Sequence, residues 1–407
     1  MSFPLGGDSP AREKKSDFHA RRKLFELREM WVFFLALPGA LLGLNLFLVR
    51  AAWRLFSGRR PLQFAAAGTA ALLLVLFLFS FVGFARRGEG GFFGFAQECF
   101  AFGVVPMVYL SFWAIAGTLA GKIFPKLSRF KFVYAGAGVV LVAVVCVAGF
   151  LNFEHPRTRF LTWETSTRRV AETPSSAEGR AAAPLRIVAA ADWHLGTRIG
   201  RSRAENFVRI VNAQNPDLVV IAGDLIDGAL APVEAEKLDE VLRKISAPLG
   251  VFATLGNHEY FSGDLRRAEA FMRRAGIRLL QDGSVLVGRD DGKKIFLVGR
   301  DDATNFRRAP LAKLLEKRPA GVPVFVSDHQ PRAADEAVAA GADFVFCGHT
   351  HGGQLWPVTW LVGFFNPHVY GLWRQAGTCG YVTSGTGLWH IPYRIGSDSE
   401  IVVIDVY

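Results

Sequence analysis

Five short segments in the second half of this sequence carry carboxylate, imidazole and carboxamide side chains. They read Ala191-Asp192-Trp193-His194, Gly223-Asp224-Leu225-Ile226-Asp227, Gly256-Asn257-His258-Glu259, Asp328-His329-Gln330-Pro331 and Gly348-His349-Thr350-His351-Gly352-Gly353. Nearly every segment follows an apolar, β-branched run, so we expect these side chains where strands end and loops begin. Loops at strand ends are where α/β folds carry their chemistry. This mixture of donors suits manganese, iron or zinc better than an all-oxygen calcium site.

Asp224 is suited to a position shared between two cations. Its two carboxylate oxygens can bridge ions about 3.5–4 Å apart, an arrangement that generates a hydroxide nucleophile and holds a phosphoryl group. Asp192 and His194 are alternate residues, so both can turn toward one ion at the end of a strand. The predicted ligand sets are Asp192, His194, Asp224 and His351 for one ion, and Asp224, Asn257, His329 and His349 for the other.

Three further side chains lie within these segments. His258 follows the predicted ligand Asn257, and a protonated imidazole there can donate to a leaving-group oxygen as a general acid. Asp227 and Glu259 are expected to accept hydrogen bonds that orient a ligand histidine or a turn.

Each motif alone has an ordinary structural explanation. An isolated Asp-x-His triplet is a weak signal, and Gly-Asn-His-Glu alone can be a turn with Asn in a left-handed conformation. The five motifs in this order, each at the end of a strand, are a strong signal. His368 and His390 lack such a context and are expected to be surface or core histidines, whereas Arg300 and Arg374 are candidates to contact a substrate phosphate.

The segment Leu355–Trp373 is rich in aromatic residues and follows the histidine pair directly. We expect most of these rings to be core. The alternative is an exposed apolar rim that holds an acyl chain or dips into a bilayer.

The elements that must position the site follow from the periodicity of residues 185–407. Strands are predicted at Leu185–Ala190, Leu218–Ala222, Val251–Leu255, Ile295–Val298, Val322–Val326, Phe344–Cys347, Gly380–Ser384 and Ile401–Val406. Amphipathic helices are predicted at Arg203–Ala213, Val233–Ile245, Leu265–Ala275 and Arg332–Ala340. This alternation of strands and helices, with a strand-rich end, indicates an α/β sandwich.

The first part of the chain holds four long apolar stretches without charged residues: about Trp31–Val49, Phe64–Phe84, Phe100–Ala120 and Phe132–Leu151. Each approaches the ~20 residues that cross a bilayer as a helix. Residues 1–184 hold 22 Lys and Arg against 11 Asp and Glu, whereas residues 185–407 hold 25 of each. Because the basic excess lies between apolar runs and not on the globular part, it indicates membrane topology and excludes a nucleic-acid partner.

The predicted organisation is a basic tail over residues 1–30, a multi-span α-helical membrane module with about four transmembrane helices over 31–151, a linker over 152–184 and a catalytic domain over 185–407. With four crossings, 13 basic residues face one side of the membrane and 8 face the other. This bias predicts a multi-pass protein of the cell membrane with its N-terminus and catalytic domain in the cytoplasm. If one run does not cross, the domain lies on the opposite side.

The motifs DxH, GDxxD, GNHE, HxP and GHTHGGQ, in this order, resemble those of the calcineurin-like metallophosphoesterase superfamily. The resemblance covers residues 185–407 and departs only at Ala191 and Trp193, which are not ligand positions. It implies a four-layer sandwich of two central β-sheets flanked by helices, the two ligand sets given above, and His258 as the residue that assists the leaving group. The closing segments Thr383–Gly387, Ile391–Arg394 and Glu400–Val402 are similar to a branch of membrane-anchored bacterial phosphohydrolases. That branch includes enzymes that cleave UDP-2,3-diacylglucosamine in lipid A synthesis.

We therefore expect a membrane-anchored phosphohydrolase with two divalent metal ions, manganese before iron, zinc or magnesium. Its hydroxide nucleophile would cleave a phosphate ester or diphosphate, on a lipid-linked or nucleotide-lipid substrate such as UDP-2,3-diacylglucosamine. The alternatives are a phosphomonoesterase or phosphodiesterase for soluble substrates, and a non-catalytic, metal-stabilised membrane scaffold. The sequence predicts the bilayer and a phosphorylated small molecule or lipid as partners, and it leaves the oligomeric state open.

Overall fold

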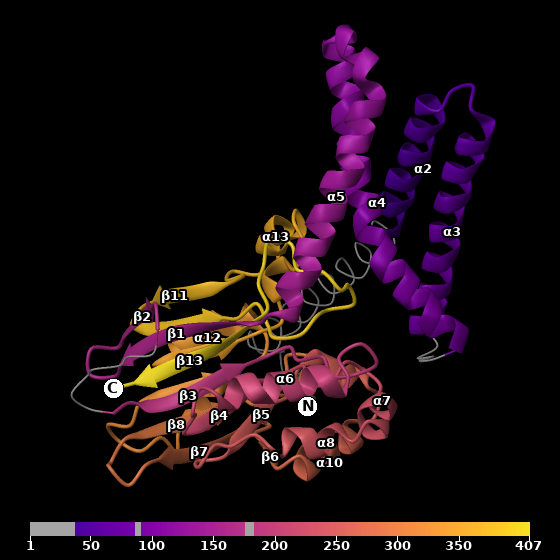
Figure 1. Ribbon diagram of the computed structural model, residues 1–407. Coiled ribbons are helices and arrows are strands. Elements are labelled where there is room, and N and C mark those ends of the chain that lie inside the picture. The colour runs from indigo at the N-terminus through magenta and orange to yellow at the C-terminus, as the bar shows by residue number, and fades with distance from the viewer. Residues whose placement is uncertain (1–36, 86–90, 176–182) are drawn as a thin grey trace, which may run out of the picture. The chain divides into compact units, whose positions relative to one another are not determined.

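The structure is a computed structural model that describes residues 37–85, 91–175 and 183–407 (Figure 1). The predicted basic tail over residues 1–30 lies outside the described residues. The chain divides into two compact units, Met1–Ala143 and Val144–Tyr407.

The first unit is helical, as the apolar runs predict. It contains α2 (Leu37–Leu55), α3 (Arg60–Ala85), α4 (Gly91–Ile123), the 3-10 helix η2 (Pro125–Phe130) and the beginning of α5 (Lys131–Glu154). Helices α2, α3 and α4 contact one another. Among the described residues, three stretches are long and apolar enough to cross a membrane: Arg60–Phe79, Gly94–Ile123 and Pro125–Glu154.

Helix α2 is not one of these three. The predicted span Trp31–Val49 begins among residues that the structure does not describe, and α2 continues through Arg50 and Arg54. The fourth crossing therefore stays a prediction.

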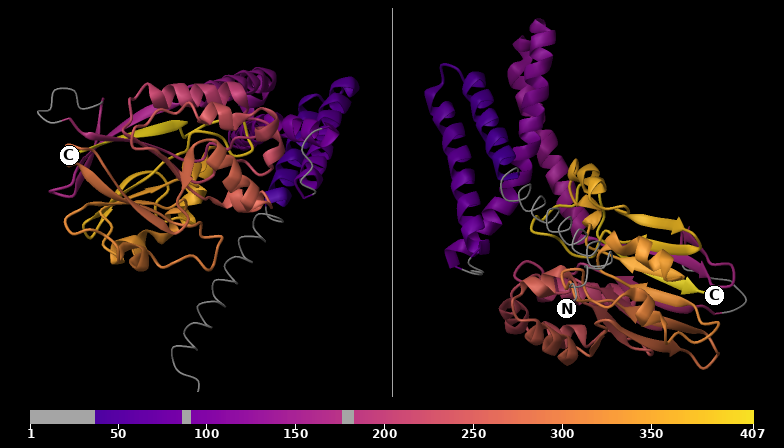
Figure 2. Two further views of the ribbon diagram at one scale, coloured as in Figure 1. Left: turned by 90° about the horizontal axis from the view of Figure 1, so that it is seen from below. Right: turned by 180° about the vertical axis from the view of Figure 1, so that it is seen from behind.

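Two β-sheets form the centre of the second unit (Figures 1 and 2). The seven-stranded sheet has the order β2-β1-β13-β3-β4-β5-β6, and the six-stranded sheet has the order β11-β12-β10-β9-β8-β7. The strands of the first are β1 (Arg157–Glu164), β2 (Arg169–Thr173), β3 (Leu185–Ala190), β4 (Leu218–Ala222), β5 (Val251–Thr254), β6 (Ile277–Leu279) and β13 (Glu400–Val406). Those of the second are β7 (Gly283–Gly288), β8 (Lys294–Gly299), β9 (Val324–Ser327), β10 (Phe344–Cys347), β11 (Gly371–Gln375) and β12 (Thr378–Val382).

Three buried clusters show that the unit has four layers. Alternate residues of β3 and β4, such as Ile187 and Val220, pack between the sheets against Phe325 and Phe346 of the second sheet. The opposite face of the first sheet packs against α6 (Arg201–Asn212), α8 (Leu238–Leu242) and α10 (Leu265–Arg274). The outer face of the second sheet packs against α11 (Leu311–Leu315) and α12 (Ala334–Ala339). Because both faces of the central strands are buried, most of their residues are apolar. The predicted four-layer sandwich is confirmed.

The remaining helices of this unit are short. They are α7 (Leu230–Ala235), α9 (Asn257–Phe261), η3 (Pro331–Ala333), η4 (His351–Gly353), α13 (Val358–Leu361) and η5 (Val362–Phe364). The predicted helix Val233–Ile245 is in fact two helices, α7 and α8, because Lys237 between them has a left-handed backbone with a φ of 51°.

The linker prediction for residues 152–184 is wrong over much of its length. β1 pairs in parallel with β13, from Arg157 opposite Glu400 to Trp163 opposite Val406, and β2 pairs with β1. Leu161 and Trp163 are buried between the two sheets. Phe153, near the end of α5, belongs to the core of the same unit. Residues 176–182 lie outside the described residues.

Candidate metal centre

The metal-ligand segments meet because the strands before them are parallel neighbours. β3, β4 and β5 pair in parallel in one sheet, and β8, β9 and β10 do so in the other. The carboxyl ends of parallel strands lie at one edge of a sheet, where α/β folds bind ligands. The segments after β3, β4, β5, β9 and β10 are the five that the sequence singles out.

Five of the candidate ligands have a left-handed backbone. Asp192, His194, Asp224, His349 and His351 have φ values between 50° and 74°. This conformation is uncommon for residues other than glycine and costs of order 1–3 kcal/mol each, so it persists only where the surroundings impose it. Such residues cluster at functional sites.

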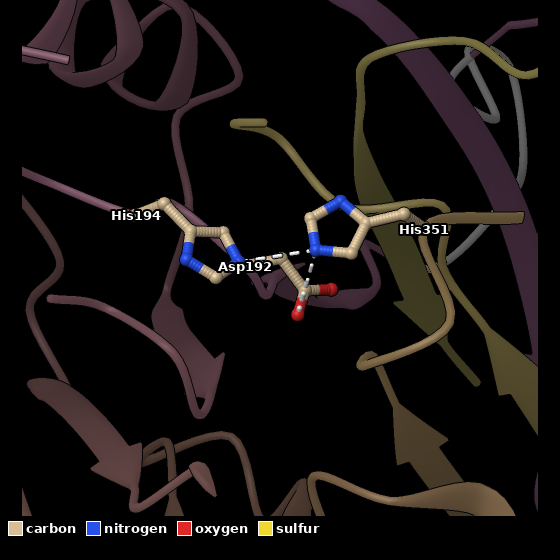
Figure 3. A group of neighbouring side chains, drawn as sticks. All are labelled: Asp192, His194 and His351. Carbon is tan, nitrogen blue, oxygen red and sulfur yellow. Dashed lines mark hydrogen bonds and ion pairs between the residues drawn. The ribbon is translucent and has the colours of Figure 1, made fainter. Parts of the chain in front are cut away.

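Asp192, His194 and His351 form the first group (Figure 3). The Nε2 atoms of His194 and His351 lie 3.0 Å apart, and the Nε2 of His351 lies 3.7 Å from the Oδ1 of Asp192. Two imidazoles bound to one ion at about 2.0–2.1 Å would bring their nitrogens roughly 3 Å apart. The observed separation is therefore compatible with a shared ion.

His194 is oriented by Asp227. Its Nδ1 lies 3.2 Å from the Oδ1 of Asp227, so the imidazole donates through Nδ1 and turns Nε2 toward the centre. Metal-binding histidines commonly have this carboxylate partner, which sets the tautomer.

Asp224, His329 and His349 form the second group, with Asn257 between the two histidines. The Oδ1 of Asn257 lies 2.9 Å from the Nδ1 of His349 and 3.2 Å from the Nε2 of His329. The Nδ1 of His329 donates to the carbonyl of Ala222 at 2.8 Å, which leaves Nε2 as the ligand atom.

One oxygen of Asp224 lies between the two groups. Its Oδ2 is 3.1 Å from the Nε2 of His329 and 3.8 Å from the Nε2 of His194. The other oxygen, Oδ1, accepts a hydrogen bond from the backbone N–H of His258 at 2.9 Å. The sequence predicts that both carboxylate oxygens take part, whereas only Oδ2 lies near both groups here, and a bridge between two cations stays a prediction.

Glycines next to the ligands leave room for this close packing. A Cβ on Gly256 would lie 2.1 Å from the Oδ1 of Asp224, and one on Gly348 would lie 2.6 Å from the Oδ2 of Asp192. Any side chain at either position would displace a candidate ligand.

The pKa values of the candidate ligands shift in both directions. Burial lowers the pKa of His349 to about 3, with His329 adding to the effect, and burial and His194 hold the pKa of His351 well below its usual value. Burial acts to raise the pKa of Asp224, but the neighbouring histidines, above all His329, outweigh it and hold that pKa well below its usual range. Burial acts to lower the pKa of His329, but Asp224 outweighs it and raises that pKa well above its usual value, and burial raises the pKa of Asp192. Neutral imidazoles and ionised carboxylates are the forms that bind a cation, so the shifts of His349, His351 and Asp224 favour binding, whereas a cation would have to displace protons from His329 and Asp192.

His258 lies beside both groups, and its imidazole is also held by Asp227. Its Nδ1 lies 2.9 Å from the Oδ1 of Asp227, and its ring centroid lies 4.5 Å from that of His194. Burial acts to lower the pKa of His258, but Asp224 and Asp227 outweigh it and raise the pKa to about 9.

Glu259 is fully buried, and its carboxylate binds the backbone of two turns, one that contains Asp224 and one that contains Gly256. Its Oε2 accepts the N–H groups of Gly256 at 2.7 Å and Asp224 at 3.0 Å, and its Oε1 accepts that of Ile226 at 2.9 Å. The contacts of Asp227 and Glu259 are those that the sequence predicts.

The structure places the two candidate phosphate-binding arginines elsewhere. Arg300 is buried, and its two terminal nitrogens donate to Asp328, Glu336 and the carbonyl of Ala309. Arg374 lies on β11, at the edge of the second sheet. His368 stacks on Trp373, in agreement with a structural role.

The sequence does not single out His390 or Arg394 as part of this site. The ring centroid of His390 lies 6.4 Å from that of His258. The buried guanidinium of Arg394 donates to the carbonyls of Gly385 and Gly387 and lies 3.4 Å from the Nδ1 of His351. Both residues come from a loop without a ligand motif, so only their place in the fold identifies them.

Comparison with known proteins agrees with this geometry. The family model of calcineurin-like phosphoesterases matches residues 185–353. A "Transmembrane protein with metallophosphoesterase domain" from Danio rerio is 35% identical over 277 residues, which cover 65% of this chain and 61% of that protein. Its Bos taurus counterpart is 32% identical, with 65% of this chain and 60% of that protein covered. An "Uncharacterized metallophosphoesterase" from Aquifex aeolicus (strain VF5) is 30% identical over 62% of this chain and 95% of its own length.

The chain thus spans about three fifths of the length of the two transmembrane relatives and nearly all of the Aquifex aeolicus protein. The family match begins at Leu185, where β3 begins, and ends at Gly353, just after His351. All five predicted segments lie inside it. The chain belongs to the calcineurin-like metallophosphoesterases.

Proposed function

We propose that the protein is a membrane-anchored phosphohydrolase that cleaves a phosphate ester or diphosphate bond. The observation that carries the proposal is the position of the Asp224 Oδ2 between the two ligand groups. A carboxylate shared by two cations is the core of two-metal hydrolytic sites.

Seven side chains would hold the two divalent cations: Asp192, His194, Asp224, Asn257, His329, His349 and His351. Their mixed nitrogen and oxygen donors favour manganese, with iron, zinc and magnesium as alternatives. Bound there, the cations would supply an activated water and neutralise charge on the phosphoryl oxygens.

His258 would act as the general acid. Its backbone N–H is anchored on Asp224 and its Nδ1 on Asp227, which leaves Nε2 to donate a proton to the departing oxygen. Asp224 and Asp227 raise its pKa to about 9 against the effect of burial, which favours the protonated imidazole that a general acid requires. Asp227 would orient both His258 and His194 and stabilise the positive charge.

We further propose a lipid-linked or nucleotide-lipid substrate, of which UDP-2,3-diacylglucosamine is one example. Support comes from the three stretches among the described residues that are long and apolar enough to cross a membrane, which would keep the site at the bilayer. A soluble phosphomonoester or phosphodiester is the alternative. A cytoplasmic position for the catalytic unit is proposed from the basic residues and requires four crossings. A reporter protein fused to Tyr407, active on only one side of the membrane, would test that position.

The test of the mechanism uses the full chain purified in detergent. Metal content is measured by mass spectrometry, and hydrolysis is followed with p-nitrophenyl phosphate and bis-p-nitrophenyl phosphate. Asp224→Asn should lose both activity and bound metal, because a carboxamide bridges two cations poorly. Asp290→Asn, an exposed position in the turn between β7 and β8, is the matched control and should behave as the unmodified chain does.

Two outcomes would contradict the proposal. Unchanged turnover by the Asp224→Asn variant would exclude the shared carboxylate from the mechanism. A metal-loaded chain that hydrolyses neither substrate, and no lipid or nucleotide-linked phosphate, would favour the scaffold alternative.

A further inference from the structure

The segment Trp356–Phe365 forms an exposed apolar projection on the second unit, which we call the aromatic knob. It contains α13 and η5, and neither helix has a buried residue. Phe364 is 81% exposed and Trp360 is 68% exposed. The other exposed members are Trp356, Val358, Leu361 and Phe365, which are 39–53% exposed. The expectation that most of these rings are core is therefore wrong.

The composition of the aromatic knob differs from that of an ordinary surface. No Asp, Glu, Lys or Arg occurs between Leu355 and Trp373. Trp356 and Trp360 pack edge to face, with ring centroids 5.6 Å apart. Soluble proteins rarely expose a continuous apolar patch of this kind unless it binds a partner or a membrane.

The base of the aromatic knob is fixed to the loop 389–397. The backbone N–H of Trp356 donates to the carbonyl of Ile395 at 2.6 Å. The side chain of Gln354 donates to the carbonyls of Trp389 and Ile391 at 3.1 and 2.8 Å. Backbone and side-chain hydrogen bonds to the loop 389–397 therefore fix the position of the aromatic knob within the second unit.

The same loop holds the end of a candidate membrane span. Helix α5 ends at Glu154, and its residues from Val144 onward belong to the second unit. Asn152 donates to the carbonyls of Arg394 and Ser397, and the N–H of Arg394 donates to the carbonyl of Gly149. One loop thus connects the end of α5 to the aromatic knob, and Figures 1 and 2 show α13 next to this end of α5.

The end of α5 indicates where lipid would stop. Val144, Val147 and Leu151 are exposed on this unit, as the lipid-facing residues of a spanning helix would be. One turn later the helix becomes polar, since Glu154 pairs with Arg203. The water–lipid boundary would therefore pass close to Leu151–Glu154, beside the loop that carries the aromatic knob.

We propose that the aromatic knob inserts into the lipid bilayer and seats the second unit on the membrane surface. Tryptophan and other aromatic rings favour the level of the lipid headgroups, and the uncharged segment can enter the boundary with the acyl chains. Continuity with the end of α5 favours lipid over a protein partner as the occupant. The inference concerns docking and does not depend on hydrolysis.

The loop at the base of the aromatic knob also lies next to the candidate metal centre. The Trp389 carbonyl is bound by Gln354, and its ring centroid lies 5.3 Å from that of His390. His390 in turn lies 6.4 Å from His258 between ring centroids. A short series of neighbouring side chains within one unit thus leads from the base of the aromatic knob to the proposed general acid.

The test uses the full chain reconstituted in phosphatidylcholine and phosphatidylglycerol vesicles. Phe364→Cys and Trp360→Cys are made separately and labelled with an environment-sensitive fluorophore. Vesicles with and without brominated lipids are compared. Leu286→Cys on β7 is the matched control, because it is an exposed apolar residue at the opposite edge of the six-stranded sheet from β11. Labelling of the four native cysteines is subtracted with the unmodified chain.

The expected result is a loss of emission at positions 364 and 360 with brominated lipids and no loss at position 286. Three results would overturn the proposal. Labels at 364 and 360 that behave as in water would show that the aromatic knob stays outside the bilayer. A blue-shifted emission that brominated lipid does not quench would show a protein occupant, such as a second copy of this chain. Equal quenching at 286 would show adsorption without a specific docking surface.

Discussion

Replacement of Glu259 tests whether one buried carboxylate holds the two turns that carry Asp224 and Asn257. Its oxygens accept three backbone N–H groups, from Gly256, Asp224 and Ile226, and its side chain is fully buried. Each buried N–H left without an acceptor costs about 1–3 kcal/mol. Glu259→Ala leaves three such groups, so we expect a loss of at least about 3 kcal/mol in the free energy of unfolding.

Glu259→Gln should have a smaller effect for a geometric reason. Its remaining carbonyl oxygen can take the place of Oε2 and accept from Gly256 and Asp224. The amide NH₂ then faces the N–H of Ile226. Because both groups are hydrogen-bond donors, the N–H of Ile226 loses its acceptor. We expect a loss of about 1–3 kcal/mol. In a unit of this size each kcal/mol lowers Tm by roughly 2–4 °C.

The assay is thermal unfolding of the full chain in detergent, followed by tryptophan fluorescence. Six of the nine tryptophans lie in the second unit, and Trp163 and Trp193 are fully buried there, so the signal reports on its core. Glu240→Gln, on the exposed side of α8, is the matched control and should change stability by less than about 0.5 kcal/mol. A Glu259→Ala chain that unfolds at the Tm of the control would refute the role assigned to this carboxylate.

Three other predictions concern the site and the core. His258→Gln should slow hydrolysis of an alkyl phosphate by about 10²–10⁴-fold and that of p-nitrophenyl phosphate much less, because p-nitrophenolate departs without a proton; equal losses for both would argue against a general acid. Gly256→Ala should lower metal content, measured by mass spectrometry, because the added Cβ would lie 2.1 Å from the Oδ1 of Asp224; full metal occupancy would contradict the tight approach. Trp163→Ala should cost about 3–5 kcal/mol in urea unfolding, since this ring is buried between the sheets. Thr167→Ala in the exposed β1–β2 turn is the control, and equal stability of the two variants would show that residues 157–173 are not part of the core.

Local sequence patterns were enough to locate most strands that carry the site. The bounds of β3, β4 and β10 coincide with the predicted runs Leu185–Ala190, Leu218–Ala222 and Phe344–Cys347. These strands are buried on both faces, so burial leaves a continuous apolar signature in the sequence. A polar residue two positions after each run (Asp192, Asp224 or His349) then marks the edge of the sheet.

Local sequence patterns do not predict which strands pair when they lie far apart in the chain. β1 lies in the interval predicted as a linker, and only its pairing with β13, some 240 residues later, makes Leu161 and Trp163 core residues. The sequence shows an interval with few apolar residues because the exposed face of β1 and the edge strand β2 are polar. The choice of partner depends on the whole sheet.

For the candidate site too, some features follow from the local sequence and others only from the tertiary structure. Residue type and spacing identify Asp224 as a carboxylate able to bridge, because that capacity belongs to the side chain. The packing of distant loops decides the rest. It determines which oxygen of Asp224 lies between His329 and His194, places Arg394 beside His351, and leaves Phe364 exposed. Chemical capacity is a property of single residues and can be read locally, whereas distance and exposure arise only when segments separated by hundreds of residues come into contact.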